Sequence, residues 1–174
     1  MSTVAGVACP AGVVLAGDRV VASGGRIRSR SRRHVLEFDR VGAAVVCGDV
    51  PAVADRLDAE IRSYRTERGR LRIDAVARLV ADVATEFDAS VLVTAPDDAG
   101  VPRLRSIDPD GGVTEESLAA LGSGAALALG VLEAGHDPEA SLDDAAALAR
   151  DALAAAAERD PGTGTDVDTY RLPA

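Results

Sequence analysis

Apolar residues along the chain fall into two patterns, short runs of strand length and longer segments with helical spacing. Runs bounded by turns that contain Gly, Pro or Asp predict β-strands. The expected strands cover Val4–Cys9, Val13–Arg19, Val35–Phe38, Val41–Cys47, Ser90–Ala95, Arg103–Asp108, Val113–Leu121 and Val167–Leu172. The first two would form a hairpin through Pro10-Ala11-Gly12, and Val20–Arg33 would be a loop that leads into an extended segment.

Four segments carry apolar residues three and four positions apart, which predicts amphipathic helices. The first would be capped by Asp49 and continue through Arg68, with Pro51 in its first turn. The others are expected over Ile73–Phe87, Ser123–Glu133 and Ala145–Arg159. The third is almost wholly apolar, so we expect it to be buried, and the fourth should pack through Leu148 and Leu153.

The order of these elements is two strand pairs, two helices, three strands, two helices and a last strand. It predicts an α+β fold in which two antiparallel sheets face each other and helices cover both outer faces, a four-layer αββα sandwich. No internal repeat or linker interrupts the pattern. A chain of 174 residues therefore forms one domain, residues 1–174.

The composition is acidic and poor in aromatic residues. Net charge is −9, aromatic residues make up 2%, and all 19 basic residues are Arg, with no Lys. Such a surface disfavours binding to nucleic acid or to anionic membranes. Asp-rich, Lys-free composition is typical of a halophilic protein, although a GC-rich genome produces the same bias, and both explanations stay open.

Other local signals concern partners, metals and location. The run of Arg within Arg26–Arg33 predicts a solvated strand face or an interface with an acidic neighbour. Cys9 and Cys47 lie in apolar strand patterns and are expected to be buried free thiols. No spacing suits a metal, so no metal or cofactor is expected. Without a transmembrane run or signal peptide, we expect a cytoplasmic protein.

The N-terminus places a hydroxyl residue, Ser2, directly behind Met1 and ahead of a core strand. A fixed terminus of this kind can present an α-amine beside a hydroxyl, as N-terminal-nucleophile hydrolases require. On this stretch alone, an ordinary first hairpin preceded by a disordered Met1-Ser2 is the favoured interpretation. Motifs further along the chain decide between the two interpretations.

Those motifs occur in a specific order. They are Ala16-Gly17-Asp18, Val45-Val46-Cys47-Gly48, Ser106-Ile107-Asp108-Pro109-Asp110-Gly111-Gly112, Leu121-Gly122-Ser123-Gly124, Gly130-Val131-Leu132-Glu133 and Glu158-Arg159-Asp160. Together, over nearly the whole chain, they resemble a proteasome β subunit of the archaeal or actinobacterial kind. The resemblance implies the αββα fold, stacked heptameric rings with other β and α subunits, and polypeptide substrates.

The resemblance also implies a catalytic set, and this chain departs from it twice. Active members use an N-terminal Thr, freed by removal of a propeptide, whose hydroxyl is tuned by a Lys and an Asp. Here Ser2 takes the Thr position, His34 the Lys position and Asp18 the Asp position, and only Met1 precedes Ser2. A histidine, with a reference pKa of about 6.5, is mostly neutral at pH 7, whereas a Lys ammonium is a dependable cation.

The remaining positions follow the family. Gly48 matches the residue whose N–H serves the oxyanion hole, Ser123 and Asp160 match the supporting hydrogen-bond pair, and Thr163-Gly164 matches a Ser-Gly near the amine. Each also has a purely structural explanation, as a turn, a helix cap or a loop residue. In the substrate pocket the resemblance puts Val46 at the floor, with Val21 and Val50 nearby, which favours apolar side chains.

Three hypotheses follow. The first is a proteasome β-type subunit with a weak or absent peptidase site. The second is an active Ser-type N-terminal-nucleophile peptidase formed when Met1 is removed. The third is an oligomeric scaffold or binding protein outside proteolysis. A relay of Asp18 and His34 to Ser2 is a further possibility within the second, although spacing alone gives it little support.

Overall fold

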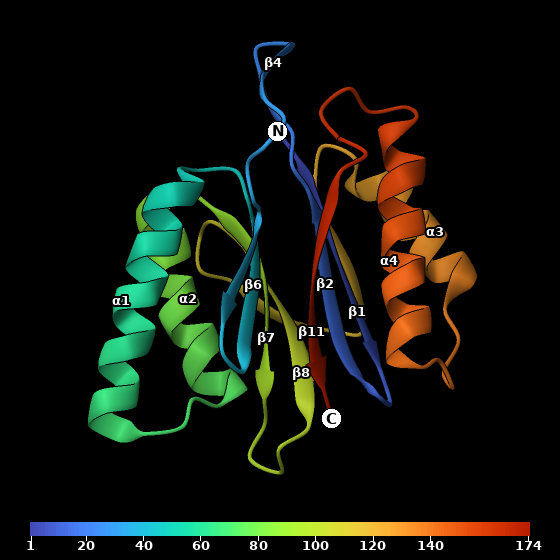
Figure 1. The fold of residues 1–174 in the computed structure, drawn as a ribbon. Coiled ribbons are helices and arrows are strands. Elements are labelled where there is room, and N and C mark those ends of the chain that lie inside the picture. The colour runs from blue at the N-terminus through green and yellow to red at the C-terminus, as the bar shows by residue number, and fades with distance from the viewer.

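The computed structural model describes residues 1–174, and its elements follow the predicted order (Figure 1). The strands are β1 (Thr3–Cys9), β2 (Gly12–Asp18), β3 (Val21–Ser23), β4 (Arg26–Ser29), β5 (Val35–Phe38), β6 (Val41–Val46), β7 (Ser90–Pro96), β8 (Pro102–Ile107), β9 (Val113–Glu116), β10 (Leu118–Gly122) and β11 (Val167–Pro173). The helices are α1 (Val50–Arg68), α2 (Ile73–Phe87), α3 (Ala125–Gly135) and α4 (Leu142–Ala157).

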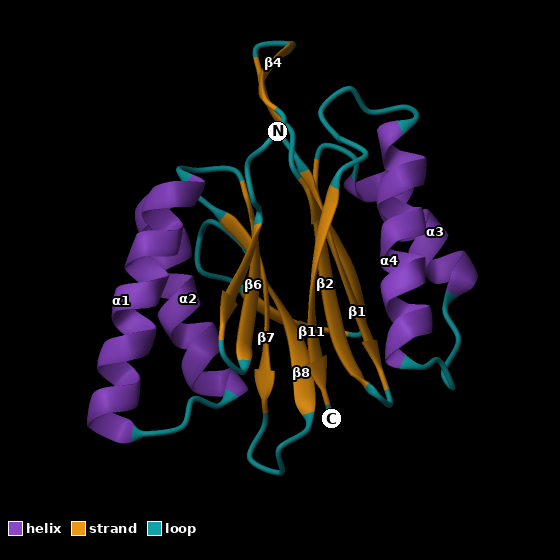
Figure 2. Cartoon of the chain, in the orientation of Figure 1, coloured by secondary structure: helices purple, strands orange, loops and turns teal.

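Two antiparallel sheets face each other and form the middle of the molecule (Figure 2). One has the strand order β10-β1-β2-β11 and the other β5-β6-β7-β8-β9, while β3 and β4 form a separate hairpin. Helices α1 and α2 cover the five-stranded sheet, and α3 and α4 cover the four-stranded sheet. The predicted αββα sandwich is therefore confirmed.

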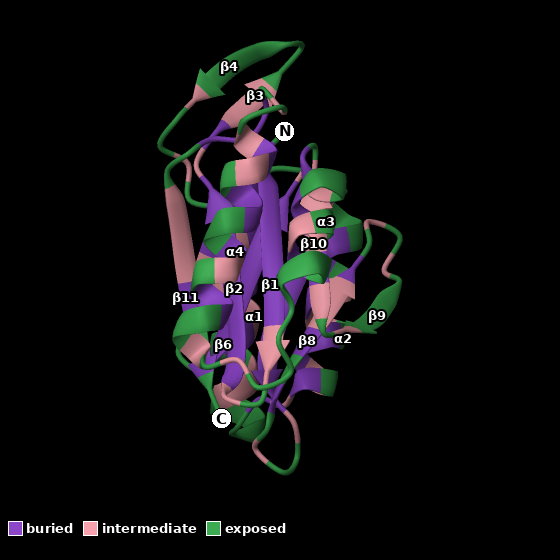
Figure 3. Ribbon diagram, turned by 90° about the vertical axis from the view of Figure 1, so that its right-hand side faces the viewer, coloured by how far each residue is buried: buried purple, intermediate pink, exposed green.

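Three apolar clusters fill the spaces between the layers, and buried residues line the strands on both faces (Figure 3). One joins α1 and α2 to the five-stranded sheet, and a second joins α3 and α4 to the four-stranded sheet. The third lies between the sheets and includes Leu15, Leu92 and Leu104. Because aromatic residues are few, small side chains make these contacts; in α4 five buried alanines accompany Leu153, while Leu148 is only half-buried.

Local sequence signals set the helix ends. The Asp49 side chain accepts from Ala52 N at 3.2 Å and so caps α1, with Pro51 in the first turn as predicted. Ser141 and Asp144 form a reciprocal capping box at the start of α4. Both caps satisfy amide groups that an isolated helix end would leave without partners.

The segment predicted as one strand over Val113–Leu121 is two strands in different sheets. β9 pairs with β8, whereas β10 pairs with β1, and the chain crosses between the sheets at Ser117. The strand-like sequence pattern continues through Ser117, because the backbone is extended both before and after this residue. The crossing depends on distant partners, which a local pattern does not reveal.

Three further expectations were wrong. Helix α3 buries only Ala128 and Leu132, and Leu127 is 39% exposed, because only one face of this helix contacts its neighbours. The stretch after Val20 contains the β3–β4 hairpin rather than a loop alone. Cys9 and Cys47 are free thiols but are half-buried, since each lies at or just beyond the end of a strand.

Candidate functional site

The N-terminal residues lie at one end of the sandwich, beside the β3–β4 hairpin (Figure 1). Ser2 precedes β1 and is only 2% exposed, whereas Met1 is 55% exposed and covers it. The Met1 ammonium donates to the Ala22 carbonyl oxygen in β3. While Met1 is attached, the nitrogen of Ser2 is an amide and has no lone pair available to act as a base.

Asp18 is the last residue of β2 and is completely buried. Its carboxylate accepts three backbone N–H groups, from Thr3 at 2.8 Å, Val20 at 2.9 Å and Gly164 at 2.6 Å. Burial raises the pKa of the Asp18 carboxyl above its ordinary value, and the three N–H donors and the nearby His34 oppose this only in part. The carboxylate therefore orders the start of β1 and the 160s loop, and no cationic side chain pairs with it.

His34 lies between the sheets, 3% exposed. Its Nδ1 atom is 2.9 Å from the Val45 carbonyl oxygen and 3.2 Å from Ser2 Oγ. A carbonyl oxygen can only accept, so the shorter contact requires a proton on Nδ1. The same N–H then points partly at Ser2 Oγ as a donor, and Nδ1 is not free to take the proton of the Ser2 hydroxyl.

The other ring nitrogen of His34 is left without any partner. Nε2 is buried and makes no hydrogen bond, and none joins His34 to Asp18. A buried nitrogen in this state costs about 1–3 kcal/mol relative to a satisfied one. The ring thus fills the position expected for the Lys but forms neither the ammonium contacts nor a relay through Asp18.

A second network reaches Thr3 rather than Ser2. Thr163 Oγ1 donates to Asp160 Oδ2 at 2.6 Å, so its contact with Thr3 Oγ1 at 2.7 Å has Thr3 as the donor. Thr3 Oγ1 in turn accepts from Gly124 N at 2.9 Å. The network is therefore directional and ends on one carboxylate, which holds the start of β1 against the loop after α4.

Ser123 completes this network, donating to Asp160 Oδ2 at 2.6 Å, as the family pattern implied. Burial alone would raise the pKa of Asp160, but the hydroxyl and N–H donors around it outweigh burial and leave the pKa below its ordinary value. A Cβ placed on Gly162 would meet Ser123 Oγ, Met1 O and Asp160 Oδ1 within 3.3 Å. The Met1–Ser2 peptide bond accordingly lies beside the Ser123–Asp160 pair.

Gly48 follows β6 in a left-handed conformation, with φ of 61°, and Cys47 before it has φ of 63°. A Cβ on Gly48 would meet the Phe87 carbonyl oxygen at 2.5 Å, so only glycine fits. The N–H of Gly48 makes no hydrogen bond within the chain. A free amide next to Ser2 suits an oxyanion hole, because such a donor is available when negative charge develops.

A pocket of about 510 Å³ opens over these groups. Its walls include Ser2, His34 and Gly48, together with the predicted Val21 and Val50. Val46 is not among the lining residues, since its side chain is buried in the cluster between the sheets. Arg32 also lines the pocket, so the lining is not uniformly apolar.

Comparison with known proteins identifies the family. The family model described as proteasome subunit matches residues 1–172. The chain belongs to the proteasome subunit family. It is 38% identical to proteasome subunit beta 1 of Hyperthermus butylicus, across 90% of this chain and 81% of that protein. Proteasome subunit beta 2 of Pyrobaculum calidifontis is 36% identical, across 96% and 86%, and subunit beta 1 of Thermococcus gammatolerans is 37% identical, across 98% and 89%.

Within this proteasome-type fold, the structure brings Ser2, His34 and Gly48 to one pocket and places Asp18 and the Ser123–Asp160 pair around it. Sequence reasoning missed the roles of Thr3 and Arg32. Thr3 gave no signal beyond being a second hydroxyl residue in a row. Arg32 lay within a run of arginines that indicated only a charged surface. No helix of the chain is both long and apolar enough to cross a bilayer.

Proposed function

We propose that the chain is a β-type subunit of a proteasome core particle, active in intracellular protein degradation, whose own peptidase site is weak or absent. The proposal of a weak or absent peptidase site rests on one observation, the contact of His34 Nδ1 with the Val45 carbonyl oxygen at 2.9 Å. It fixes the proton on the nitrogen that faces Ser2, and therefore removes the base that a Ser–His pair would need.

The electrostatics around Ser2 support the same proposal. Attack by Ser2 Oγ would build negative charge on the substrate carbonyl, near the buried carboxyl of Asp18. A Lys ammonium at position 34 would offset this carboxyl, but the chain contains no Lys. Loss of one such contact typically lowers a rate by about 10²–10³. The free N–H of Gly48 remains as a candidate oxyanion donor in the pocket.

The competing function is an active Ser-type peptidase formed after removal of Met1. The exposure of Met1 and the Ser123–Asp160 pair beside its peptide bond favour this alternative. Removal of Met1 would free an α-amine next to Ser2 Oγ, and the amine could then act as the base without His34. A scaffold role outside proteolysis has no observation of its own in the site.

A fluorogenic-peptide assay on assembled particles, combined with N-terminal sequencing, separates these proposals. Ser2→Ala removes the nucleophile, and Thr163→Ser, a conservative change in the network that keeps its hydroxyl, is the matched control. The degenerate site predicts cleavage at or barely above the level of Ser2→Ala, even in chains shown to start at Ser2. Rapid cleavage that is lost in Ser2→Ala and unchanged in Thr163→Ser would establish the active peptidase instead.

The proposal also covers assembly and location. As a member of the proteasome subunit family, the chain would form stacked heptameric rings with other β and α subunits in the cytoplasm. The excess of acidic residues, with a net charge of −9, would keep such particles soluble at high salt. Sedimentation of the chain mixed with an α-type subunit tests assembly, and a profile with only monomer would contradict it.

A further inference from the structure

A second pocket lies at the end of the sandwich opposite Ser2, where the β5–β6 turn meets the loop between α1 and α2 (Figure 1). Its volume is about 510 Å³. Four arginines line it, contributed by the β5–β6 turn, by α1 and by the loop that follows it: Arg40, Arg65, Arg70 and Arg72. Asp39 is the single acidic residue of the lining, which leaves three net positive charges in a chain whose total is −9.

The walls of this pocket are firmly packed. Val41 is 1% exposed and Leu71 is 5% exposed, and both belong to the cluster beneath α1 and α2. Gly69 turns the chain with φ of 85° and donates its N–H to Arg65 O at 3.1 Å, which closes the end of α1. The backbone next to the arginines is therefore packed against the apolar core.

Two of the guanidinium groups are oriented by backbone oxygens. Arg65 Nη2 donates to Phe38 O at 2.7 Å and lies 3.4 Å from Asp39 Oδ2. Arg72 Nη1 donates to Asp97 O at 3.1 Å, and Arg72 Nε lies 3.9 Å from Oδ1 of the almost fully exposed Asp98. These contacts use only part of the donor capacity of each group, because a guanidinium carries five N–H donors.

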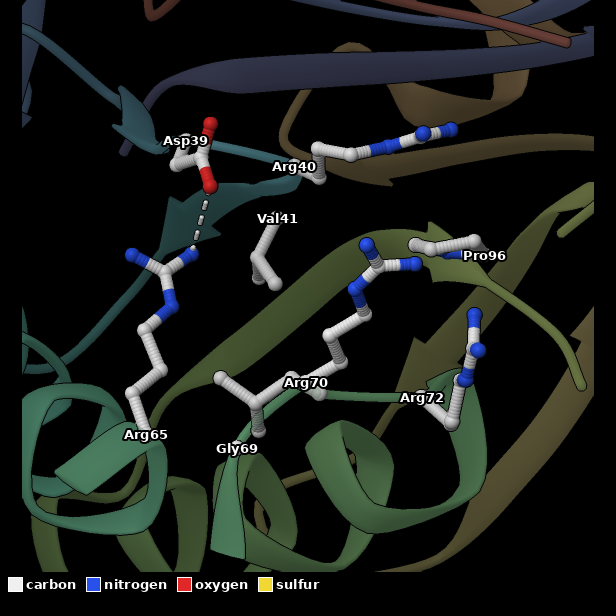
Figure 4. Close-up of a pocket in the computed structure, with 9 residues that line it drawn as sticks. Asp39, Arg40, Val41, Arg65, Gly69, Arg70, Arg72 and Pro96 are labelled. Atoms are coloured by element: carbon white, nitrogen blue, oxygen red, sulfur yellow. Dashed lines mark ion pairs between the residues drawn. The ribbon is translucent and has the colours of Figure 1, made fainter.

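The other two guanidinium groups have no partner at all. Neither Arg40 nor Arg70 makes an ion pair or a side-chain hydrogen bond within the chain. In Figure 4 the guanidinium groups of Arg70 and Arg72 reach toward Pro96, and Arg40 extends over the same side. Arg65 lies on the other side of the view, beside Asp39, with which it forms an ion pair. Like charges brought together in this way repel each other unless an anion lies between them.

We propose that this pocket binds a di- or triphosphate group, either free in solution or as part of a nucleotide. Three net positive charges match the charge of such a group better than that of a single carboxylate. Guanidinium forks bind phosphate oxygens in bidentate fashion, and unpaired arginines are free to do so. The hydrophobic residues of the lining, Val41 and Leu71, are at most 5% exposed. They offer an aromatic or aliphatic side chain little to pack against, which disfavours a peptide partner.

The site is separate from the Ser2 pocket and does not depend on whether that pocket is catalytic. Its occupation would neutralise the repulsion between the arginines and stabilise the junction of α1, α2 and the β5–β6 turn. A ligand that binds only the folded chain raises its unfolding midpoint in proportion to the logarithm of its concentration. Binding is therefore measurable in the full chain without any assay of peptidase activity.

The test is isothermal titration with tripolyphosphate, ATP and inorganic phosphate, at a constant ionic strength of about 0.15 M. We expect saturable binding of tripolyphosphate and much weaker binding of inorganic phosphate. Arg70→Gln, and separately Arg40→Gln, should weaken tripolyphosphate binding about tenfold or more, since each removes a charge-assisted contact. Arg28→Gln removes an exposed charge from β4, remote from this pocket, and should leave binding unchanged.

The titration with ATP shows whether the pocket recognises a free phosphate chain or a nucleotide. Equal affinity for ATP and tripolyphosphate supports recognition of the phosphate chain alone, and tighter binding of ATP supports a nucleotide. The proposal is overturned if no probe binds saturably, or if Arg28→Gln weakens binding as much as Arg70→Gln. A glutamate-rich peptide that binds more tightly than tripolyphosphate would also overturn it, because the pocket would then be a protein-docking site.

Discussion

His34 donates its Nδ1–H to the carbonyl oxygen of Val45, at 2.9 Å, across adjacent strand ends of the five-stranded sheet. This one bond decides the chemistry of the nitrogen nearest Ser2 Oγ. A lysine at the same place would bring an ammonium group, a donor with three N–H groups and no acceptor, close to the carboxyl of Asp18. The histidine instead donates from Nδ1, and its second nitrogen is buried without a hydrogen-bond partner.

The directional network from Gly124 to Asp160 should make Thr163 important for stability. Thr163→Val leaves the Thr3 hydroxyl, which is completely buried, without its acceptor. We expect a loss of about 1–3 kcal/mol in the free energy of unfolding. Thr163→Ser keeps the hydroxyl and should lose clearly less. Urea unfolding of both variants checks this, and equal losses would show that the methyl group, not the network, is responsible.

Tyr170 should produce a loss of stability at alkaline pH. Its hydroxyl donates to Asp39 O at 2.7 Å, and burial, with the negative charges of Glu37 and Asp39, raises its pKa to about 12. The unfolded chain releases this proton near pH 10 and the folded chain near pH 12, so the free energy of unfolding should fall between these values. A shift of two pKa units corresponds to about 3 kcal/mol.

Tyr170→Phe is the variant that isolates this effect. At pH 7 it should be less stable than the parent by about 1 kcal/mol, because the hydrogen bond is lost. Between pH 10 and 12 the difference should shrink and then reverse, since phenylalanine has no proton to release. Unfolding curves at several pH values measure it, and a constant difference between the two proteins would refute the assignment.

Salt should stabilise the folded chain. Nine net negative charges repel one another at low ionic strength, and screening shortens the reach of that repulsion to roughly 3 Å near 1 M salt. We expect the midpoint of thermal unfolding to rise between about 0.1 M and about 1 M NaCl, where the Debye length falls from about 10 Å to about 3 Å. A flat or falling midpoint would leave the halophilic interpretation without physical support.

The sequence predicted most of the fold because hairpins and helices are signalled locally. Pro10-Ala11-Gly12 marks the β1–β2 turn, and Asp49 with Pro51 marks the start of α1. The change of sheet at Ser117 escaped prediction because it depends on pairing with β1, more than a hundred residues away. The exposed face of α3 was not predicted, because alanine and glycine count as apolar in the pattern although their exposure to solvent carries little free-energy penalty.

The candidate site was predicted in part. Residue identities placed Ser2, Asp18 and His34 together through the family pattern, yet the partner of His34 is a backbone oxygen, which residue types do not reveal. The arginine pocket was not predicted from the sequence, for a related reason. Arg40, Arg65, Arg70 and Arg72 are spread over more than thirty positions and three elements, and only the folded arrangement gathers them.

The central claim is that the residue at position 34, and not the nucleophile, limits the rate of peptide hydrolysis. Its most direct test compares His34→Lys with Ser2→Thr in assembled particles from which Met1 has been removed in every sample. Ser2 already supplies a hydroxyl, while His34→Lys restores a cation beside Asp18 where negative charge develops. We predict that His34→Lys raises the peptide-hydrolysis rate by about 10²–10³ and that Ser2→Thr raises it less. A larger gain from Ser2→Thr, or an unmodified protein that already cleaves rapidly and loses all cleavage in Ser2→Ala, would contradict the account.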